Sequence, residues 1–303
     1  METNNISVII SSNYIIPCVV TLQSLYSTKK TNSKYSINII LIESDTSNDK
    51  TQLTKFNKED FKINITTIEK DPNLSLFEQA MFLKLNLDKL LPNVSKTLFL
   101  DIDIIVNKDL SELYNTDITG KYLGAVRDIY PVILYERTHK TYNKNYFNVG
   151  VMLLNLDLIR QDKKFELARN KFKDYLKFNF PEQDLLNDLI KDKFKILHPK
   201  YNWIISNTYY TKKQLNNFYG IDKNEINDND ISIFHYAGFK PWNTIGIPYS
   251  KYWDKYFNMT LKKDIKLKKT INKNTLLSNF KFAIEQYRIF TNKELYSSVG
   301  LIK

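Results

Sequence analysis

The chain has 303 residues, enough to bury a full core as one large domain or as one domain with appendages. Its single cysteine, Cys18, excludes an intramolecular disulfide and fits a reducing compartment. No run of about 18 apolar residues could span a bilayer, and the N-terminus lacks the basic start of a signal peptide, so we expect a cytoplasmic protein.

The net charge of +11 is unevenly distributed along the chain. Residues 262–303 hold ten Lys and Arg against three Asp and Glu, a net +7, which leaves 34 basic and 30 acidic residues, a net +4, for 1–261. A nucleic-acid-binding protein should instead spread positive charge over a folded surface with interleaved aromatic residues. We therefore expect no nucleic-acid partner.

Strand-like and helix-like segments alternate from the N-terminus onward. Expected strands are 6–10, 36–42, 62–68 and 96–106, and the helices expected between them are 14–27, 48–57 and 76–90. This alternation predicts an α/β fold with a mostly parallel mixed sheet flanked by helices. Ligands of such sheets bind beyond the carboxyl ends of the strands.

The pattern continues to about residue 248 and then changes. Further expected strands are 122–126, 149–154 and 231–235, and further expected helices are 165–178 and 182–191. An apolar stripe over 275–290 predicts an amphipathic helix within the basic tail. We therefore divide the chain into an α/β domain, 1–258, and a basic amphipathic helical extension, 259–303.

The stretch 96–106 carries two aspartates, Asp101 and Asp103, at the C-terminal end of an expected buried strand. A strand has a period of two, which predicts that both carboxylates project to one side and that Ile102 turns into the core. Adjacent carboxylates repel one another unless a cation lies between them, and a hard divalent cation is the natural candidate. The alternative is a pair that caps a helix expected at 109–113.

The same spacing occurs at Asp228 and Asp230, within the polar run 224–230. No buried strand leads into that run, so we expect a solvated turn there. Spacing alone is therefore weak evidence for a metal site, and the residues elsewhere in the chain must decide.

Four further segments carry polar groups next to expected strands or helices. Asn148 and Gly150 stand just ahead of a buried strand, 181–184 opens a helix with three polar side chains, 235–242 offers His235, Gly238 and Lys240, and 124–128 ends with Asp128. Each has an ordinary alternative, such as a turn residue, a packing glycine, an acid at a helix N-terminus or a solvated lysine. No glycine-rich phosphate loop follows the first strand.

Taken together, the motifs F-L-D-I-D, F-N-V-G-V, E-Q-D and H-x-x-G-x-K-P-W resemble glycosyltransferase family 8. The resemblance runs from Ile6 to Trp242. It implies a Rossmann-like GT-A nucleotide-sugar-binding domain that retains the configuration of the transferred sugar. The expected donor is UDP-galactose or UDP-glucose, and the expected acceptor is a hydroxyl of a lipopolysaccharide, a capsule or a similar glycolipid.

The resemblance also implies roles for single residues. Asp101, Asp103 and His235 would bind Mn²⁺, with Mg²⁺ as an alternative; this ligand set suits Mn²⁺ better than Ca²⁺. The implied substrate contacts are Asn13, Tyr14, Asp101, Ile102, Asp128, Asn148, Gly238 and Lys240. The implied catalytic residues are Gln183, Glu182, Asp184 and Lys240, with Gln183 below the anomeric carbon and Lys240 on the departing diphosphate.

Retention of configuration often indicates a carboxylate nucleophile, but an amide such as Gln183 is a poor one. We therefore expect the acceptor hydroxyl to attack from the side of the leaving group, with covalent catalysis by Glu182 or Asp184 as the alternative. Other readings are a GT-A enzyme of another donor or of inverting stereochemistry, and a non-catalytic UDP-sugar-binding protein.

Several positions depart from the family pattern. Ser11 and Ser12 stand where an acidic residue often helps to bind uracil, and Phe82 stands where an arginine is frequent. Lys84 could replace that arginine, although lysine does not bind phosphate in bidentate fashion. Glu182 stands where an aspartate is common, so the sugar cannot be inferred from the family.

The basic tail allows two interpretations. Basic and apolar side chains on one helix can attach a protein to anionic lipid, at about 1 kcal/mol per basic residue. Peripheral attachment to the inner face of the cytoplasmic membrane is therefore one expectation, and packing of the tail on the α/β domain is the other.

Overall fold

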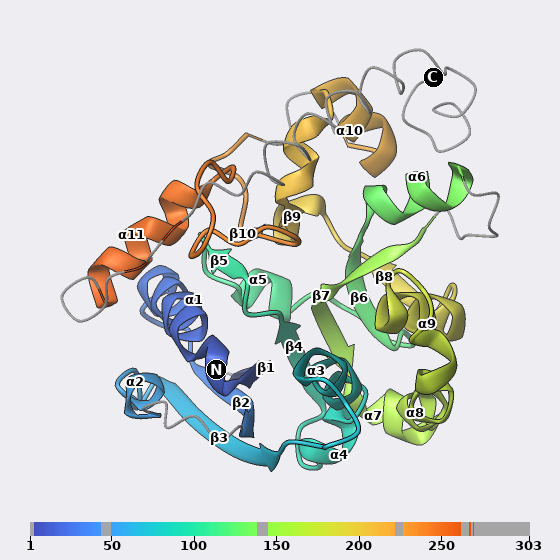
Figure 1. The fold of residues 1–303 in the computed structure, drawn as a ribbon, viewed down its shortest axis with the longest axis horizontal. Coiled ribbons are helices and arrows are strands. Elements are labelled where there is room, and N and C mark those ends of the chain that lie inside the picture. Colours follow the sequence, from blue (N-terminus) through green and yellow to red (C-terminus); the bar gives the residue numbers. More distant parts are fainter. Residues whose placement is uncertain are drawn as a thin grey trace.

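A computed structural model describes residues 3–43, 50–137, 145–221, 227–261, 267 and 269. Its central sheet has seven strands in the order β3-β2-β1-β4-β7-β6-β8 (Figure 1). These strands are β1 Asn4–Ser11, β2 Tyr35–Glu43, β3 Phe61–Glu69, β4 Lys96–Leu100, β6 Leu123–Arg127, β7 Phe147–Asn155 and β8 Phe194–Ile196. Only β7 among them runs antiparallel to its neighbours, β4 and β6. The expectation of a mostly parallel mixed sheet is confirmed.

Helices cover both faces of this sheet. The α-helices are α1 Ile15–Thr28, α2 Thr51–Thr54, α3 Leu76–Lys84, α4 Leu87–Leu90, α5 Ser111–Tyr114, α6 Ile129–Arg137, α7 Leu156–Gln161, α8 Lys164–Tyr175, α9 Pro181–Ile190, α10 Lys212–Tyr219 and α11 Ser250–Thr260. Three short 3₁₀ helices are η1 Ser12–Tyr14, η2 Pro199–Tyr201 and η3 Ile205–Tyr209. In Figure 1, α1 lies over the N-terminal strands, and α8 and α9 lie toward the opposite edge.

The alternation of side chains along each strand builds two separate cores. On β1, Val8 and Ile10 join the core that includes Val19 of α1, whereas Ile9 joins the core that includes Met81 of α3 and Leu185 of α9. Because both faces are covered, the strands read as nearly continuous apolar runs, as is usual for parallel sheets. The polar residues that could bind a ligand therefore lie at the ends of the strands.

The single strand expected over 96–106 is wrong. β4 ends at Leu100, residues 101–103 form a bend, and β5 Ile104–Val106 enters a second sheet of order β5-β10-β9 with β10 Ile233–His235 and β9 Trp203–Ile204. The two-residue period of a strand therefore does not determine the directions of the Asp101 and Asp103 side chains. Ile102 is half-buried beside a cavity instead of turning wholly into the core. The chain leaves the main sheet here because β5 pairs antiparallel with β10.

Other boundaries also differ from the sequence-based expectations. β7 begins at Phe147, so Asn148 and Gly150 lie within that strand and not ahead of it. The helix expected over 76–90 is split into α3 and α4, with a capping box at Ser75 and Glu78 starting α3. The expected helix 48–57 is reduced to the short α2.

The tail is described only at its start. The expected helix 275–290 lies outside the described residues, and α11 runs through the expected boundary at 258 to Thr260. Leu267 packs against the core, and Nζ of Lys269 lies 2.5 Å from Oδ1 of Asp254 and above the ring of Trp253. Among the described helices, none is long and apolar enough to cross a membrane.

Candidate active site

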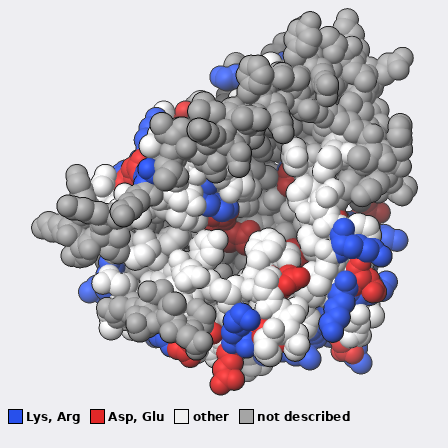
Figure 2. Space-filling model, viewed as in Figure 1, with Lys and Arg blue, Asp and Glu red and all other residues white. Residues whose placement is uncertain are grey.

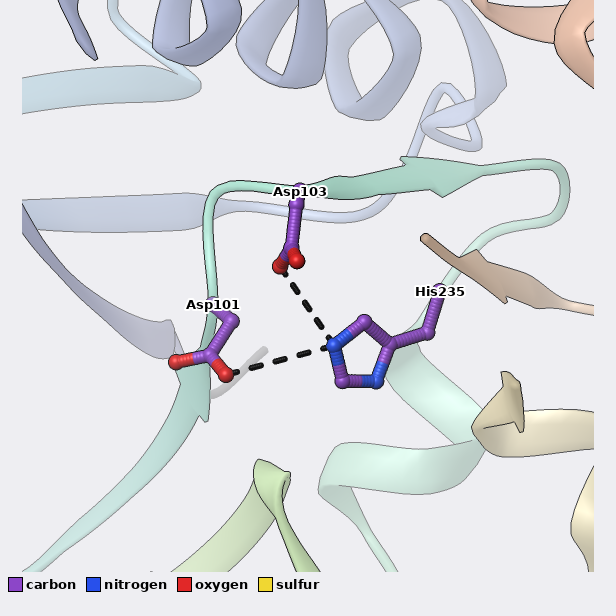
Figure 3. A group of neighbouring side chains, drawn as sticks. All are labelled: Asp101, Asp103 and His235. Atoms are coloured by element: carbon purple, nitrogen blue, oxygen red, sulfur yellow. Dashed lines mark ion pairs between the residues drawn. The ribbon is translucent and has the colours of Figure 1, made fainter. Parts of the chain in front are cut away.

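Asp101, Asp103 and His235 converge at the junction of the two sheets (Figure 3). Both carboxylates come from the bend between β4 and β5, and His235 is the last residue of β10. Nε2 of His235 lies 3.4 Å from Oδ1 of Asp103 and 4.0 Å from Oδ2 of Asp101. One ligand atom from each residue lies within 4.8 Å of the others, and this is the one such group among the described residues.

Backbone hydrogen bonds hold the bend in place. The amide of Asp101 donates to the carbonyl of Gly150 at 2.7 Å, and the amide of Tyr236 donates to the carbonyl of Asp103 at 2.8 Å. The first bond ties the bend to β7 and the second ties it to the residue after β10. Long-range pairing, and not the local period of a strand, therefore brings the two carboxylates to the histidine.

Gly150 provides the space that this group needs. A Cβ atom at Gly150 would overlap Cε1 of His235 and would lie 2.8 Å from Oδ2 of Asp101. Two carboxylates and an imidazole nitrogen facing one another across this hollow suit a divalent metal ion with mixed oxygen and nitrogen preference. The residues present therefore fit the metal that the family resemblance implies.

Two lysines supply positive charge to the two aspartates. Lys84 is 4% exposed, and its Nζ lies 3.2 Å from Oδ1 of Asp101 and 2.5 Å from Oε1 of Glu182. Burial alone would lower the pKa of Lys84, but these two carboxylates outweigh it and raise the pKa. Lys240 forms an ion pair with Asp103. Burial would raise the pKa of Asp103, yet Lys240 beside it holds that pKa well below its usual range.

A second cluster of polar side chains lies beside the metal-ligand candidates, around the start of β7 and of α9. Nδ2 of Asn148 donates to Oδ2 of Asp128 at 2.9 Å and faces Oε1 of Gln183 at 3.2 Å. Nε2 of Gln183 donates to the same Asp128 oxygen at 3.1 Å. Burial raises the pKa of Asp128, opposed by these two donors. The three side chains therefore form one closed network at the carboxyl end of β6.

The two acids beside Gln183 differ in their surroundings. Oε1 of Glu182 pairs with Lys84, whereas Oε2 is buried with no described donor, and burial raises the pKa of this carboxyl. Asp184 accepts a 2.5 Å hydrogen bond from the hydroxyl of Tyr146. Glu182 lines the central cavity, whereas Asp184 is not among its lining residues.

The cavity that joins these clusters has a volume of about 850 Å³. Figure 2 shows acidic atoms at the floor of a hollow near the middle of this face of the molecule. Except for Asp184, the residues expected to act on substrate or metal all line it: Asn13, Tyr14, Asp101, Ile102, Asp103, Asp128, Asn148, Glu182, Gln183, His235, Gly238 and Lys240. The fold thus brings residues from position 13 to position 240 into one space.

The mouth of the cavity carries aromatic rings. Tyr14 is 39% exposed and meets Trp242 edge to face, with ring centroids 6.2 Å apart. Tyr130 meets Phe180 in the same geometry at 6.2 Å, and Phe77 is exposed. Sequence reasoning did not single out Tyr130, Phe180 or Phe77, because aromatic residues in amphipathic segments are usually core.

Asn202 was also missed, although its Oδ1 lies 2.9 Å from Nδ1 of the metal-ligand candidate His235. Asn202 is completely buried between β9 and η2. A signal was present, since an amide stands between the aromatic residues Tyr201 and Trp203 ahead of an apolar run. Its partner could not be inferred, because 33 residues separate it from His235.

Comparison with known proteins identifies the family of the chain. The sequence profile of glycosyl transferase family 8 matches residues 5–246. A lipopolysaccharide 1,2-glucosyltransferase of Escherichia coli is 26% identical over 300 residues, which cover 94% of this chain and 87% of that protein. A putative glycosyltransferase of Haemophilus influenzae is 33% identical over 141 residues, or 45% of this chain and 42% of that protein, so the match spans less than half of it.

Solved structures share the fold. The galactosyltransferase LgtC, solved in complex with donor and acceptor sugar analogues, superposes with a TM-score of 0.71 at 19% identity, covering 89% of this chain and 98% of that one. The bifunctional glycosyltransferase WbbM superposes with a TM-score of 0.68 at 18% identity, covering 86% of this chain and 50% of that one. The expected GT-A fold is confirmed. The chain therefore belongs to glycosyl transferase family 8 and is a glycosyltransferase.

Proposed function

We propose that the chain is a retaining, metal-dependent hexosyltransferase that moves galactose or glucose from a UDP-sugar to a hydroxyl of a surface glycan. One observation carries the proposal: a carboxylate–carboxylate–imidazole group and a network of sugar-sized polar contacts open into the same 850 Å³ cavity. A cavity of this volume, lined by both polar and apolar side chains, is typical of sites for small ligands.

The diphosphate end of the donor belongs at Asp101, Asp103 and His235. A Mn²⁺ ion bound there, with Mg²⁺ as the alternative, would neutralise charge on the departing diphosphate. Lys240 would supply a further positive charge, and to do so its ammonium must leave the Asp103 carboxylate that it contacts here. Gly238 lines the same part of the cavity with φ of +96°, a conformation that side-chain-bearing residues rarely adopt.

The uracil end belongs near Asn13 and Tyr14, which line the cavity from η1, whereas Gln183 lines it from α9. Both are exposed at the end of β1, beyond Ser11, where ligands of parallel sheets bind. The ring of Tyr14 offers a stacking surface that Trp242 holds edge to face.

The hexose belongs beside Glu182, Asp128 and Asn148. Oε2 of Glu182 is buried without a described donor, and a sugar hydroxyl would satisfy it. Its other oxygen pairs with Lys84, which holds the carboxyl group in place. Hydrogen bonds of this kind distinguish sugars that differ at one hydroxyl, because a wrong configuration leaves a buried group unpaired.

The surroundings of Gln183 favour direct transfer over a covalent intermediate. Oε1 of Gln183 accepts from the amide of Val149 at 3.3 Å and from Nδ2 of Asn148, so its lone pairs are engaged. Asp184 is held by Tyr146, and Glu182 by Lys84. The acceptor oxygen would then bond to the anomeric carbon as the sugar–phosphate bond breaks on the same face, and its proton would pass to a diphosphate oxygen.

A membrane-borne glycan is the proposed acceptor. The Escherichia coli relative is named for lipopolysaccharide, and the tail of this chain has a net charge of +7 over 262–303. Such a tail would hold a cytoplasmic enzyme against anionic lipid on the inner face of the membrane. Sedimentation with phosphatidylglycerol vesicles tests this part: removal of 262–303 should release the protein, and unchanged sedimentation would contradict membrane attachment by the tail.

The function itself is tested with purified protein, Mn²⁺ and a panel of UDP-sugars. One UDP-hexose should raise the melting temperature only when Mn²⁺ is present, since a ligand of the native state stabilises it. UDP release should follow, and NMR of the transferred sugar should show the anomeric configuration of the donor. An inverted product, or binding without turnover in the presence of glycan acceptors, would replace the proposal with one of its alternatives. Turnover unaffected by Asp103→Asn and His235→Ala would show that the site is elsewhere.

A further inference from the structure

A buried chain of side-chain amides joins the metal-ligand candidates to the proposed sugar site. Its central member is Asn202, which is completely buried. Oδ1 of Asn202 lies 2.9 Å from Nδ1 of His235, and its Nδ2 lies 2.9 Å from Oδ1 of Asn148. No other described side chain touches a metal-ligand candidate and a proposed sugar contact through neutral groups in this way.

The orientation of the Asn148 and Asn202 side-chain amides follows from one backbone group. The amide N–H of Gly150 can only donate, and it lies 2.8 Å from the Asn148 side chain, so that atom of Asn148 is the oxygen. The Asn202 atom facing the same oxygen must therefore be the NH₂ group. The remaining Asn202 atom is then the carbonyl oxygen, and it faces Nδ1 of His235.

This orientation determines the tautomer of His235. An amide oxygen accepts but cannot donate, so Nδ1 of His235 carries the hydrogen. In a neutral imidazole, Nε2 then holds the lone pair, and Nε2 is the nitrogen that faces Asp103 at 3.4 Å. The imidazole therefore presents to a metal ion the atom able to bind it.

The side-chain amide of Gln183, at the other end of this row of amides, is oriented independently, and its orientation agrees with that of Asn148. The amide N–H of Val149 lies 3.3 Å from Oε1 of Gln183, which identifies that oxygen. Nδ2 of Asn148 then donates to it and to Oδ2 of Asp128, leaving no conflict of two donors or two acceptors. Two adjacent backbone amides of β7, those of Val149 and Gly150, thus set the direction of the whole chain.

We propose that Asn202 is a positioning residue that fixes the Nδ1–H tautomer and the ring orientation of His235, and that couples this ligand to the sugar contact Asn148. The inference rests on the proposed function, because it assigns a role toward the metal and donor of that site. Groups that bond the outer nitrogen of a metal-binding histidine commonly change metal affinity by about 10- to 100-fold when removed.

The experiment measures Mn²⁺ binding by isothermal titration calorimetry, without any donor, for three variants. Asn202→Leu removes both hydrogen bonds at similar volume, and we expect its Mn²⁺ affinity to fall by roughly 10- to 100-fold. Asn202→Asp keeps an acceptor for His235, so its Mn²⁺ affinity should stay within a few-fold of the wild type or rise. Asn207→Leu is the matched control, since Asn207 is equally buried and its side chain hydrogen-bonds Tyr219, which is neither a metal-ligand candidate nor a proposed sugar contact.

The ring itself gives a second readout. In ¹⁵N-histidine NMR of the metal-free protein, His235 should show the Nδ1–H tautomer in the wild type and in Asn207→Leu, and should lose it in Asn202→Leu. Asn202→Asp, whose side chain has nearly the same size and shape, should also raise the KM for the UDP-sugar because the hydrogen bond donated to Asn148 is lost.

The possible outcomes separate the two proposals. A wild-type protein that binds no Mn²⁺ or Mg²⁺ would contradict the proposed function. If the wild type binds Mn²⁺ and Asn202→Leu binds it equally well, or if Asn202→Asp and Asn207→Leu weaken binding as much as Asn202→Leu, the role of Asn202 is wrong. Selective weakening in Asn202→Leu, with the change of tautomer, supports it.

Discussion

Two segments of this chain carry Asp-x-Asp, and of the two only Asp101 and Asp103 lie in the candidate site. Asp101 and Asp103 leave the central sheet in a bend that β7 and β10 hold from both sides. Asp228 and Asp230 lie in an exposed turn, as expected, where Asp228 accepts from the hydroxyl of Tyr249. The spacing is the same, and the difference lies in what other parts of the chain bring to each pair.

Burial and counter-charge distinguish the pairs physically. Asp103 is 9% exposed and lies against Lys240 and His235, and the charge of Lys240 holds its pKa low in spite of burial. The side chain of Asp230 is 43% exposed and lies 3.7 Å from Lys108, itself 46% exposed. Exposed ion pairs contribute little to stability, whereas buried charges must be compensated. An aspartate pair therefore becomes a metal-site candidate only when its charge is costly to leave unpaired.

The largest expected effect comes from neutralising one member of each pair. Asp103→Asn should lower Mn²⁺-dependent UDP release by roughly 1000-fold, the size expected for removal of a main electrostatic contributor. Asp230→Asn should leave that rate unchanged, because its carboxylate faces solvent and Lys108. Initial rates across a Mn²⁺ titration measure both. Equal rates for the two variants would remove the distinction between the pairs.

The counter-charges give the next contrast. Lys84→Met keeps the length of the side chain but leaves the Glu182 and Asp101 carboxylates without their shared cation, and should lower the free energy of unfolding by about 3 kcal/mol. Lys108→Met should change it by less than about 0.5 kcal/mol. Urea denaturation monitored by circular dichroism compares them. A loss below 1 kcal/mol in Lys84→Met would mean that the buried carboxylates are already protonated or solvated.

The smallest expected effect concerns the space beside the metal ligands. In Gly150→Ala the new methyl group would overlap His235, so we expect a loss of about 1–3 kcal/mol in stability together with weaker Mn²⁺ binding. Gly124→Ala in the neighbouring β6 would meet only the side chains of Leu197 and Ile118, at 3.2 Å and beyond, and is the control. Calorimetric Mn²⁺ titration should separate the two, and unaltered binding in Gly150→Ala would show that the ligands can shift.

Much of the fold could be predicted from local patterns. Local sequence patterns predict β1, β2 and β3, because each is a run with many apolar residues, and they predict the start of α3, because Ser75 and Glu78 form its capping box. The bend at 101–103 could not be predicted, because β5 is a strand only through its pairing with β10, more than a hundred residues later. The same applies to β9, a two-residue strand that depends on that pairing.

The candidate site divides in the same way. Motifs in the sequence located the aspartates, His235, Asn148, Glu182, Gln183 and Lys240, and their order indicated the family. They did not indicate that Lys84 joins Asp101 to Glu182, or that Asn202 stands behind His235. The first contact depends on how α3 and α9 lie beside the end of β4, and the second depends on the pairing of β9 with β10.

By itself, the sequence determined the α/β class, the family and most of the side chains that line the cavity, because these are properties of single segments. Tertiary structure alone decided which Asp-x-Asp faces a histidine, which lysine is buried between two carboxylates, and which nitrogen of His235 faces Asp101 and Asp103. The reason is physical: charge compensation and hydrogen-bond direction in a buried site depend on groups brought together from distant positions, and no local pattern records them.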